Sequence, residues 1–248
     1  MYQKYMKNIF SENGEDGIIL EILKRLKLNK KNKWCCEFGA WDGIHGSNTF
    51  NLVKNFNFQA IYIEGDKERY EDLIATSKKF KKIIPFNRYV SHKKKNTNSL
   101  DNILKKTKIV KNFDILSIDI DSFDLAVWKS LKRYRPKIVV IEINSEVPPG
   151  VRQEHNISKI GNSFTSTVEF ATKNKYQLVC HTGNCIFIDK KYTNKLKINK
   201  KFTNNNNVNL LFDTTWLNKK ESFIKKILKI FLSRKVIDFF KKYIKKIR

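Results

Sequence analysis

Apolar residues along the chain form short runs that alternate with stretches of helical periodicity. Short apolar runs bounded by turn residues are typical of strands that are buried on both faces of a sheet. On this pattern the sequence predicts strands over 34–40, 60–66, 82–90, 113–121, 136–144, 176–183 and 184–190. Apolar spacings of three and four residues predict helices over 15–26, 48–55, 68–79, 100–106, 124–133 and 163–175.

This alternation predicts an α/β fold of the Rossmann-like class, with a mostly parallel twisted sheet and helices on both of its faces. Only turn residues around Gly183 and Asn184 separate the last two apolar runs, so these should close the sheet as a C-terminal antiparallel hairpin. Ligands of such sheets bind beyond the carboxyl ends of the strands. Functional residues are therefore sought where each predicted strand ends.

The composition changes after residue 190. We predict a main domain over 1–190, a polar linker or loop rich in Asn and Lys over 191–218, and a basic amphipathic helix over 219–248. The last segment combines an apolar stripe with Lys-rich flanks, which suits docking on an anionic membrane surface. The alternative is that this helix packs on the domain and leaves its lysines in solvent.

The net charge is +26, from 50 Lys and Arg against 24 Asp and Glu. Such a chain should attract phosphate, nucleic acid or anionic lipid, unless the charge only reflects a bias toward lysine codons. The charge is spread along the chain and concentrated in its last 30 residues, so a small-molecule or glycan acceptor is favoured over nucleic acid.

Neither a signal-peptide-like apolar run nor a segment of ~20 apolar residues is present. The four cysteines form no CxxC pair, which favours reduced thiols. We therefore expect a cytoplasmic protein, with peripheral attachment at the inner membrane as an extension.

The first predicted strand ends in a loop with two glycines and two carboxylates. Gly39 and Gly43 permit tight turns, and Ala40 lies between them. The loop does not match GxGxxG, and Glu37 and Asp42 would repel a pyrophosphate. They suit a cationic ligand instead, such as the methionine part of S-adenosylmethionine.

The second predicted strand ends in Glu64 and Gly65. An acidic residue at this position, about 20 residues after the first glycine loop, can accept hydrogen bonds from both ribose hydroxyls of an adenosyl group. The alternative is a surface carboxylate without a ligand.

Polar side chains also end the fourth and fifth predicted strands. Asp119 and Asp121 should share one side of their strand, and Glu142 and Asn144 one side of the next. Asp121, Glu142 and Asn144 could hold Mg²⁺ or Mn²⁺, which prefer oxygen ligands. The same groups could instead bind substrate hydroxyls, act as a general base, or form a structural hydrogen-bonded cluster.

Three histidines are candidates for proton transfer near neutral pH. His181 ends the sixth predicted strand and should face the cleft, while His45 and His155 lie in the loops after the first and fifth strands. GxSxG, Walker and HExxH motifs are absent, which disfavours hydrolases and kinases.

Several blocks in this order resemble the FkbM-like group of S-adenosylmethionine-dependent methyltransferases. They are FSENGEDGII (10–19), CEFGAWDGIHGSNT (36–49), IYIEGD (61–66), FDILSIDIDSFDLAVWKSL (113–131) and PKIVVIEIN (136–144). The resemblance covers residues 9–190 and implies a class I methyltransferase fold and O-methylation of sugars or other small hydroxyl compounds.

The resemblance also implies site residues. It makes Glu37, Gly39, Asp42 and Gly43 the cofactor loop and Glu64 the ribose ligand, and it places Asp119 and Asp121 beside the methyl group. From the NGEDG block it adds Asn13, Glu15 and Asp16 at the edge of the cleft. The sequence departs from the pattern at Ser122 and Phe123, where relatives often have Gly and a polar residue.

The leading hypothesis is an S-adenosylmethionine-dependent O-methyltransferase acting on a hydroxyl of a sugar or sugar-linked small molecule, in surface glycan or capsule biosynthesis. Asp119, Asp121 and His181 are its catalytic candidates, with Mg²⁺ or Mn²⁺ as an optional second cofactor. The alternatives are an RNA methyltransferase and a membrane-docked, methyltransferase-like binding module without activity.

Overall fold

A single sheet forms the centre of the computed structural model, which describes residues 1–27, 33–198, 202 and 208–213. The sheet has seven strands in the order β3-β2-β1-β4-β5-β7-β6. Their bounds are β1 Trp34–Phe38, β2 Gln59–Glu64, β3 Ile83–Asn87, β4 Ile115–Ile118, β5 Ile138–Glu142, β6 Tyr176–His181 and β7 Asn184–Asp189. The first five strands are parallel, and β7 pairs antiparallel with both β5 and β6. The predicted parallel sheet and C-terminal hairpin are confirmed.

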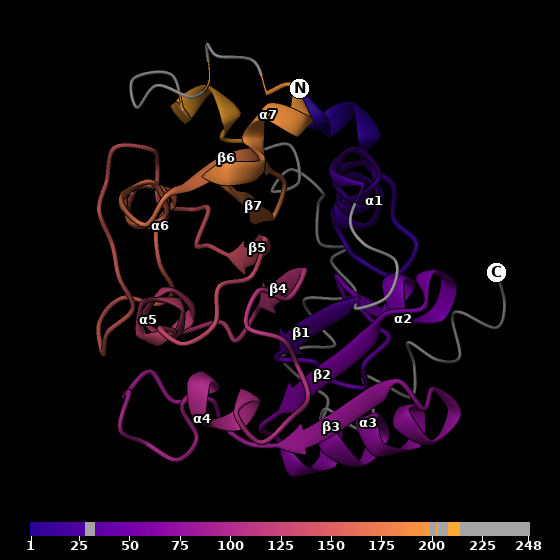
Figure 1. Cartoon of the computed structure of the whole chain (residues 1–248). Helices are drawn as coiled ribbons and strands as arrows, with labels where there is room; N and C mark the ends of the chain where they lie inside the picture. The colour runs from indigo at the N-terminus through magenta and orange to yellow at the C-terminus, as the bar shows by residue number, and fades with distance from the viewer. Residues whose placement is uncertain (28–32, 199–201, 203–207, 214–248) are drawn as a thin grey trace, which may run out of the picture. The chain divides into compact units, whose positions relative to one another are not determined.

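Helices cover both faces of the sheet (Figure 1). Their bounds are α1 Glu15–Leu26, α2 Phe50–Phe56, α3 Lys67–Lys79, α4 Leu100–Leu104, α5 Asp124–Ser130, α6 Phe164–Lys173 and α7 Thr193–Leu196, with short 3-10 helices η1 Tyr2–Tyr5, η2 Lys190–Tyr192 and η4 Val208–Leu211. One apolar core joins the sheet to α4, α5 and α6, and a second joins it to α1, α2 and α3. This arrangement is the doubly wound fold that the alternation predicted.

Strand residues alternate between these two cores. Trp34, Cys36 and Phe38 of β1 belong to the core under α4 to α6, whereas Cys35 belongs to the other. All four cysteines are buried and unpaired, and burial raises the pKa of each thiol, so the structure assigns them to packing. None of the helices in the described part of the chain is long and apolar enough to cross a membrane.

Several elements end earlier than the sequence pattern predicted. β4 ends at Ile118 rather than at 121, and β1 ends at Phe38 rather than at 40. The apolar runs continue past these points, but the chain turns where Gly39 and Asp121 adopt positive φ angles of 76° and 59°. The functional loops therefore begin closer to the sheet than expected.

Parts of the predicted linker over 191–218 fold against the domain. Leu196 of α7 is fully buried, and its carbonyl accepts a hydrogen bond of 2.7 Å from the Tyr2 hydroxyl. Leu211 of η4 is also buried, at 2% exposure. Residues 191–218 are mostly polar, so the sequence did not predict that a few of their apolar residues, such as Leu196 and Leu211, complete the two cores. The predicted amphipathic helix over 219–248 lies outside the described residues.

Candidate active site

The carboxyl ends of the parallel strands bring the predicted site loops together. Gly39, directly after β1, packs against the tip of β4, and a Cβ added there would lie 1.6 Å from the Asp119 carbonyl oxygen. The Asp119 amide in turn donates to the Phe38 carbonyl at 3.2 Å. Only glycine fits this contact, so the predicted cofactor loop and the predicted catalytic loop share one backbone junction.

The side chain of Glu37 forms hydrogen bonds with the loop that follows β1. Its carboxylate is 4% exposed and accepts hydrogen bonds from the Ser47 and Thr49 hydroxyls, at 2.7 and 2.5 Å, and from the Asn48 amide at 3.0 Å. Burial raises the pKa of Glu37, and the hydrogen bonds from this loop partly oppose the rise. The Glu37 carboxylate therefore holds the loop in place, and its predicted contact with a cofactor stays a prediction.

Asp42 folds its own loop and remains partly accessible. Its carboxylate accepts from the amides of Ile44 and His45, both at 2.8 Å, and pairs with the His45 ring. The Asp42 side chain is 17% exposed and that of His45 is 44% exposed. The next residue, Gly43, has a φ of 76° and packs against Leu73 and Tyr62. The loop thus offers one carboxylate and one imidazole at its surface.

Glu64 joins the ends of β1 and β2. Its two carboxylate oxygens accept from the amides of Trp41 and Asp66, each at 2.8 Å, and the residue is 5% exposed. Each oxygen has a second lone pair, so these contacts leave acceptor capacity. Ala40 is buried, and its amide donates to the Ile63 carbonyl at 3.2 Å. Gly65 packs against the ring of Tyr89, which is 73% exposed and which the sequence had not singled out.

Three carboxylates converge where β4 and β5 end. Oxygens of Asp119, Asp121 and Glu142 lie within 4.8 Å of one another. Asp119 and Asp121 meet because the chain turns beyond β4, not because they alternate along a strand as predicted. Asp124 fixes this turn by accepting from the amides of Ile120 and Ser122, both at 2.9 Å. We call the carboxylates of Asp119, Asp121 and Glu142 the acid cluster.

Two members of the acid cluster, Asp119 and Glu142, hold protons more tightly than isolated carboxylates do. Burial, followed by the charge of Glu142, raises the pKa of Asp119 well above its ordinary range. Burial and then the charge of Asp121 raise the pKa of Glu142 to about 7. Glu142 can therefore take up or release a proton near neutral pH, and its deprotonated form is a base of suitable strength.

The same carboxylates suit a divalent cation. Mg²⁺ and Mn²⁺ prefer such oxygen ligands, and a bound cation would relieve the mutual repulsion within the acid cluster. The predicted set of Asp121, Glu142 and Asn144 changes, because Asp119 replaces Asn144. The Asn144 amide group donates to the Ile160 carbonyl at 3.1 Å and accepts from the Glu146 amide at 3.0 Å, so it shapes the loop after β5.

His181 is buried and does not face the cleft. Its Nδ1 accepts from the Asp213 amide at 2.9 Å, its Nε2 lies 3.3 Å from the Ser145 hydroxyl, and its ring stacks on Phe212 at 4.9 Å. Burial lowers its pKa to about 4. The predicted catalytic role of His181 is wrong, since the segment around residue 212, which the sequence could not place, covers the ring.

The NGEDG block fastens the N-terminus to the rest of the domain. Glu15 is fully buried and accepts from Thr182 at 2.8 Å and Asn184 at 3.2 Å, in the β6–β7 hairpin. Asp16 is 2% exposed, and one of its oxygens accepts from three backbone amides. The predicted cleft-edge role of Glu15 and Asp16 is therefore wrong. Asn13 is partly exposed beside Gly183 and remains a candidate.

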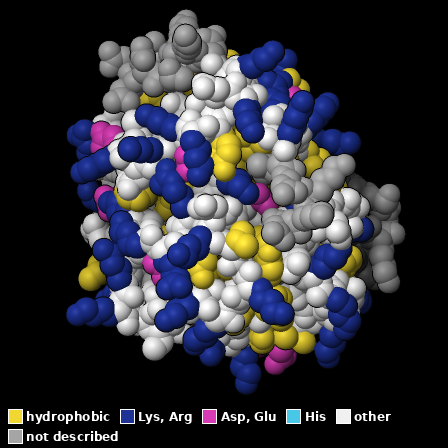
Figure 2. Space-filling model, viewed as in Figure 1, with side chains coloured by type: hydrophobic (Ala, Val, Ile, Leu, Met, Phe, Trp, Pro, Cys, Tyr) yellow, Lys and Arg dark blue, Asp and Glu magenta, His cyan; other side chains and the backbone are white. Residues whose placement is uncertain are grey.

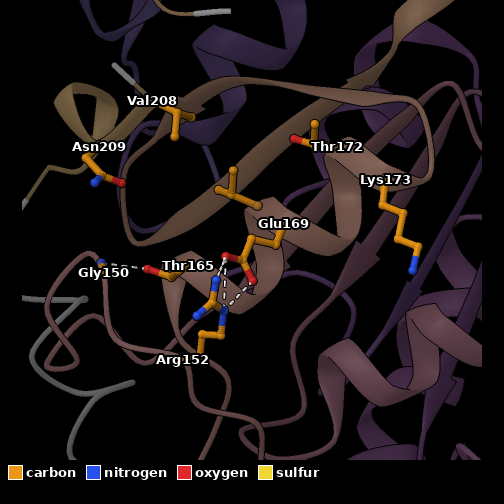
Figure 3. Close-up of a pocket in the computed structure, with 9 residues that line it drawn as sticks. Gly150, Arg152, Thr165, Glu169, Thr172, Lys173, Val208 and Asn209 are labelled. Carbon is orange, nitrogen blue, oxygen red and sulfur yellow. Dashed lines mark hydrogen bonds and ion pairs between the residues drawn. The ribbon is translucent and has the colours of Figure 1, made fainter. Parts of the chain in front are cut away.

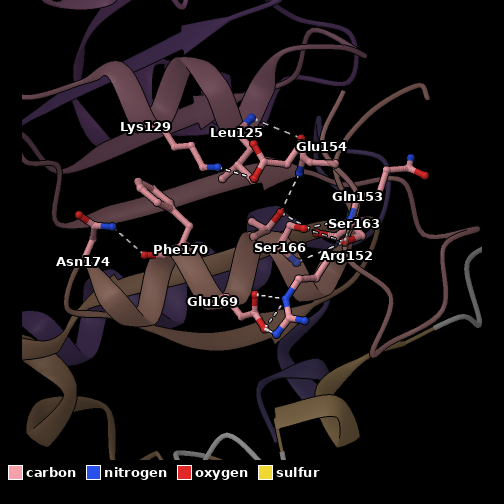
Figure 4. Close-up of polar contacts among 12 residues, drawn as sticks. Leu125, Lys129, Arg152, Gln153, Glu154, Ser163, Ser166, Glu169, Phe170 and Asn174 are labelled. Atoms are coloured by element: carbon pink, nitrogen blue, oxygen red, sulfur yellow. Dashed lines mark hydrogen bonds and ion pairs between the residues drawn. The ribbon is translucent and has the colours of Figure 1, made fainter. Parts of the chain in front are cut away.

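Salt bridges and hydrogen bonds hold the long loop between β5 and α6 (Figure 4). Lys129 pairs with Glu154 at 2.5 Å, and Arg152 pairs with Glu169 at 2.6 Å. Within this loop His155 accepts from the Gly161 amide at 3.1 Å through Nδ1. His155 also packs edge-to-face on Phe123, which sequence reasoning had noted only as a departure from the family pattern.

A hollow of about 500 Å³ lies between α6, the β5–α6 loop and η4 (Figure 3). Its lining includes the Arg152–Glu169 pair, Thr165 and Asn209. None of the predicted site residues lines it. The predicted site residues at the strand ends therefore lie outside this hollow.

The family described as Methyltransferase FkbM domain matches residues 15–177, which include the glycine loop and the acid cluster. Among curated proteins no sequence matches this chain.

Solved structures with a similar arrangement include several methyltransferases. TrmK of M. capricolum in complex with S-adenosylhomocysteine is 16% identical, with 92% of this chain and 97% of that chain covered and a TM-score of 0.42. The N-terminal domain of EvdMO1 with S-adenosylhomocysteine and D-fucose is 11% identical, with 71% and 82% covered and a TM-score of 0.43. A SAM-dependent methyltransferase from Aquifex aeolicus is 12% identical, with 68% and 87% covered and a TM-score of 0.41.

Proposed function

Because the chain belongs to the Methyltransferase FkbM domain family and is an S-adenosylmethionine-dependent methyltransferase, we propose that it methylates a hydroxyl of a sugar or sugar-linked small molecule. The observation that carries this proposal is the position of the acid cluster. The backbone carbonyl of Asp119 directly contacts the glycine loop at Gly39, so the turn that carries two of these carboxylates adjoins the cofactor loop.

The loops at the ends of β1 and β2 fit this cofactor. Residues 39–49 contain no Lys or Arg, although the chain as a whole is strongly basic. Asp42 supplies a partly exposed carboxylate that suits a cationic ligand, and Glu64 lies where ribose hydroxyls can donate to it. Tyr89 supplies an exposed ring beside Gly65. These groups favour a positively charged nucleoside over a pyrophosphate.

When bound, S-adenosylmethionine supplies a methyl group whose bond to sulfur breaks as its bond to the acceptor oxygen forms. The protein must orient the acceptor hydroxyl and take its proton. Glu142 is the proposed base, since its pKa of about 7 lets it accept a proton at neutral pH. Asp121 orients the hydroxyl. In an alternative arrangement, Mg²⁺ or Mn²⁺ held by the same three carboxylates would make the hydroxyl more acidic, and Glu142 would then be a ligand instead of the base.

Calorimetric titration with S-adenosylhomocysteine tests the cofactor site. We expect an affinity of about 1–10 μM for the wild-type protein. Glu64→Gln should weaken it by about tenfold or more, because an acceptor for charge-assisted hydrogen bonds is lost. Glu71→Gln, an equivalent change at an exposed position of α3, should have no effect. A folded wild-type protein that binds neither the cofactor nor its product would refute the proposal.

An RNA acceptor is the alternative that the net charge of +26 favours. Lys and Arg side chains cover much of the visible face, while Asp and Glu are few there (Figure 2). An RNA enzyme should bind RNA with an affinity that falls steeply with salt, and should transfer a labelled methyl group to RNA. Transfer of the labelled methyl group to a sugar, without transfer to RNA, would support the main proposal.

A further inference from the structure

Three rings lie together beside the acid cluster. The ring of Phe123 stacks on that of His92, with centroids 4.5 Å apart and planes at 21°. His155 packs against the same ring at 4.4 Å and 65°. Phe123 follows Asp121 by two positions and is 36% exposed. We call His92, Phe123 and His155 the aromatic platform.

The platform joins three loops that are distant in the sequence. His92 comes from the β3–α4 connection, Phe123 directly precedes α5, and His155 belongs to the β5–α6 loop. These loops are braced, since Ser91 pairs with Ser99 and the Gly161 amide donates to His155. Aromatic surfaces next to polar groups are typical of small-ligand sites. The platform is thus an aromatic surface built from the loops that follow β3, β4 and β5, and its Phe123 lies two positions along the chain from Asp121.

A run of cations follows the platform directly. Lys93, Lys94 and Lys95 come immediately after His92 and are all exposed, and Arg88 is exposed earlier in the same connection. Within the described residues none of these four forms an ion pair with a carboxylate, whereas Lys129 and Arg152 across the platform are both paired. Unpaired Lys and Arg side chains gathered on one loop attract phosphate groups.

We propose that the acceptor is a glycosyl phosphate. Its sugar packs against the aromatic platform, its reacting hydroxyl points to the acid cluster, and its phosphate binds Arg88 and Lys93 to Lys95. Charge decides this orientation: the carboxylates repel a phosphate, whereas the cations that follow His92 attract it. This inference rests on the proposed function and adds the chemical class of its substrate.

Binding to the protein saturated with S-adenosylhomocysteine tests the proposal. The probes are glucose, glucose 1-phosphate and inorganic pyrophosphate, titrated to about 10 mM. We expect glucose 1-phosphate to bind about tenfold tighter than glucose, since charge-assisted hydrogen bonds add to the sugar contacts. Equal affinities for the two sugars, or no binding of either phosphate probe, would overturn the proposal.

Matched triple variants locate the phosphate. K93A/K94A/K95A should weaken glucose 1-phosphate and pyrophosphate about tenfold, as expected for the loss of several charged donors. K105A/K106A/K108A removes the same charge from exposed lysines between α4 and β4, outside the proposed phosphate loop, and should leave both affinities unchanged. Equal losses in the two variants would mean a general charge effect and would contradict the proposed site.

The aromatic contact has its own variant. Phe123→Leu should weaken glucose 1-phosphate and leave pyrophosphate unchanged, because only the sugar touches the platform. Loss of both would contradict this placement. Affinity for S-adenosylhomocysteine is measured on every variant, so a failure of the cofactor site is recognised separately from a failure of the acceptor site.

Two sources of glycosyl phosphate are distinguished by two further acceptors. UDP-glucose represents a nucleotide-linked sugar, and phosphatidylglucose in phosphatidylcholine vesicles represents a lipid-linked one. Under the proposal at least one of them should compete with glucose 1-phosphate in the wild type and lose that ability in K93A/K94A/K95A. Competition that persists in the triple variant would argue against the basic loop as the phosphate site.

Discussion

The carboxylates of the site divide by what surrounds each one. Glu37, Glu15 and Asp16 are buried and accept hydrogen bonds from protein groups, so they maintain the fold. Burial raises the pKa of Asp119 and Glu142, and neighbouring carboxylates raise both further. The residue type is similar in both groups, and only the neighbours separate a structural carboxylate from a candidate base.

Glu142→Gln tests the proposed base. With the proton acceptor removed, kcat should fall by about 10²–10⁴-fold. Wild-type activity should rise with pH as Glu142 loses its proton near its pKa of about 7, and this limb should vanish in the variant. Glu146→Gln, at an exposed position nearby, is the control and should keep both kcat and the pH profile. An unchanged profile in Glu142→Gln would assign the proton to another group.

His181 predicts a different pH effect, on stability. Its pKa is lowered from 6.5 to about 4, so between these values the unfolded chain binds a proton that the folded protein does not. The free energy of unfolding should therefore fall as the pH falls from 6.5 to 4. His181→Gln should reduce this slope in urea unfolding at several pH values, and should leave the pH profile of kcat unchanged. Loss of the acidic or alkaline limb of the kcat–pH profile in His181→Gln would instead support a catalytic role for His181.

At the scale of elements, the loops rather than the strands determine the site. The turn after β4 holds Asp121 at a positive φ, and Gly39 lets the turn after β1 touch it. The last described segment, residues 208–213, closes the core on one face and covers His181. This segment belongs structurally to the domain, although it follows a run of four asparagines and lies within the predicted linker.

Leu211→Ala tests the contribution of this segment. Leu211 is 2% exposed, so truncation should lower the free energy of unfolding by about 2–4 kcal/mol through lost burial and a cavity. The neighbour Leu210 is 57% exposed, and Leu210→Ala should change the value by less than about 0.5 kcal/mol. Urea unfolding measures both. Equal effects would mean that residues 208–213 do not pack on the core as described.

At the scale of the whole molecule, charge is the dominant property. Most of the 50 Lys and Arg residues have no carboxylate to pair with, because only 24 Asp and Glu are present. The predicted helix over 219–248 concentrates this charge. We expect it to dock on anionic lipid, where a lipid-linked acceptor would be available to the site.

Vesicle flotation tests membrane docking. The full chain should float with vesicles that contain phosphatidylglycerol and remain unbound with phosphatidylcholine alone, and high salt should release it. A chain ending at residue 218 should lose this binding while keeping its affinity for S-adenosylhomocysteine. Equal flotation of both chains would assign membrane binding to the domain, and absence of flotation would leave the tail without this role.

The sequence by itself determined the order of the elements, the parallel sheet, the closing hairpin and the edge where the site lies. These follow from local periodicity and from the rule that parallel strands end at one edge. It also led to Asp119, Asp121 and Glu142, since each ends an apolar run. Glu64 was found in the same way, and its proposed ribose contact stays a prediction.

Only the tertiary structure decided which of these side chains are accessible. The Glu15 carboxylate accepts hydrogen bonds from Thr182 and Asn184, which lie 167 and 169 positions further along the chain. His181 bonds to Asp213, which lies beyond a polar stretch of the sequence. The stack of His92, Phe123 and His155 likewise joins three distant loops. Periodicity reports on neighbours a few residues apart, whereas burial and pKa depend on groups that folding brings together from the whole chain.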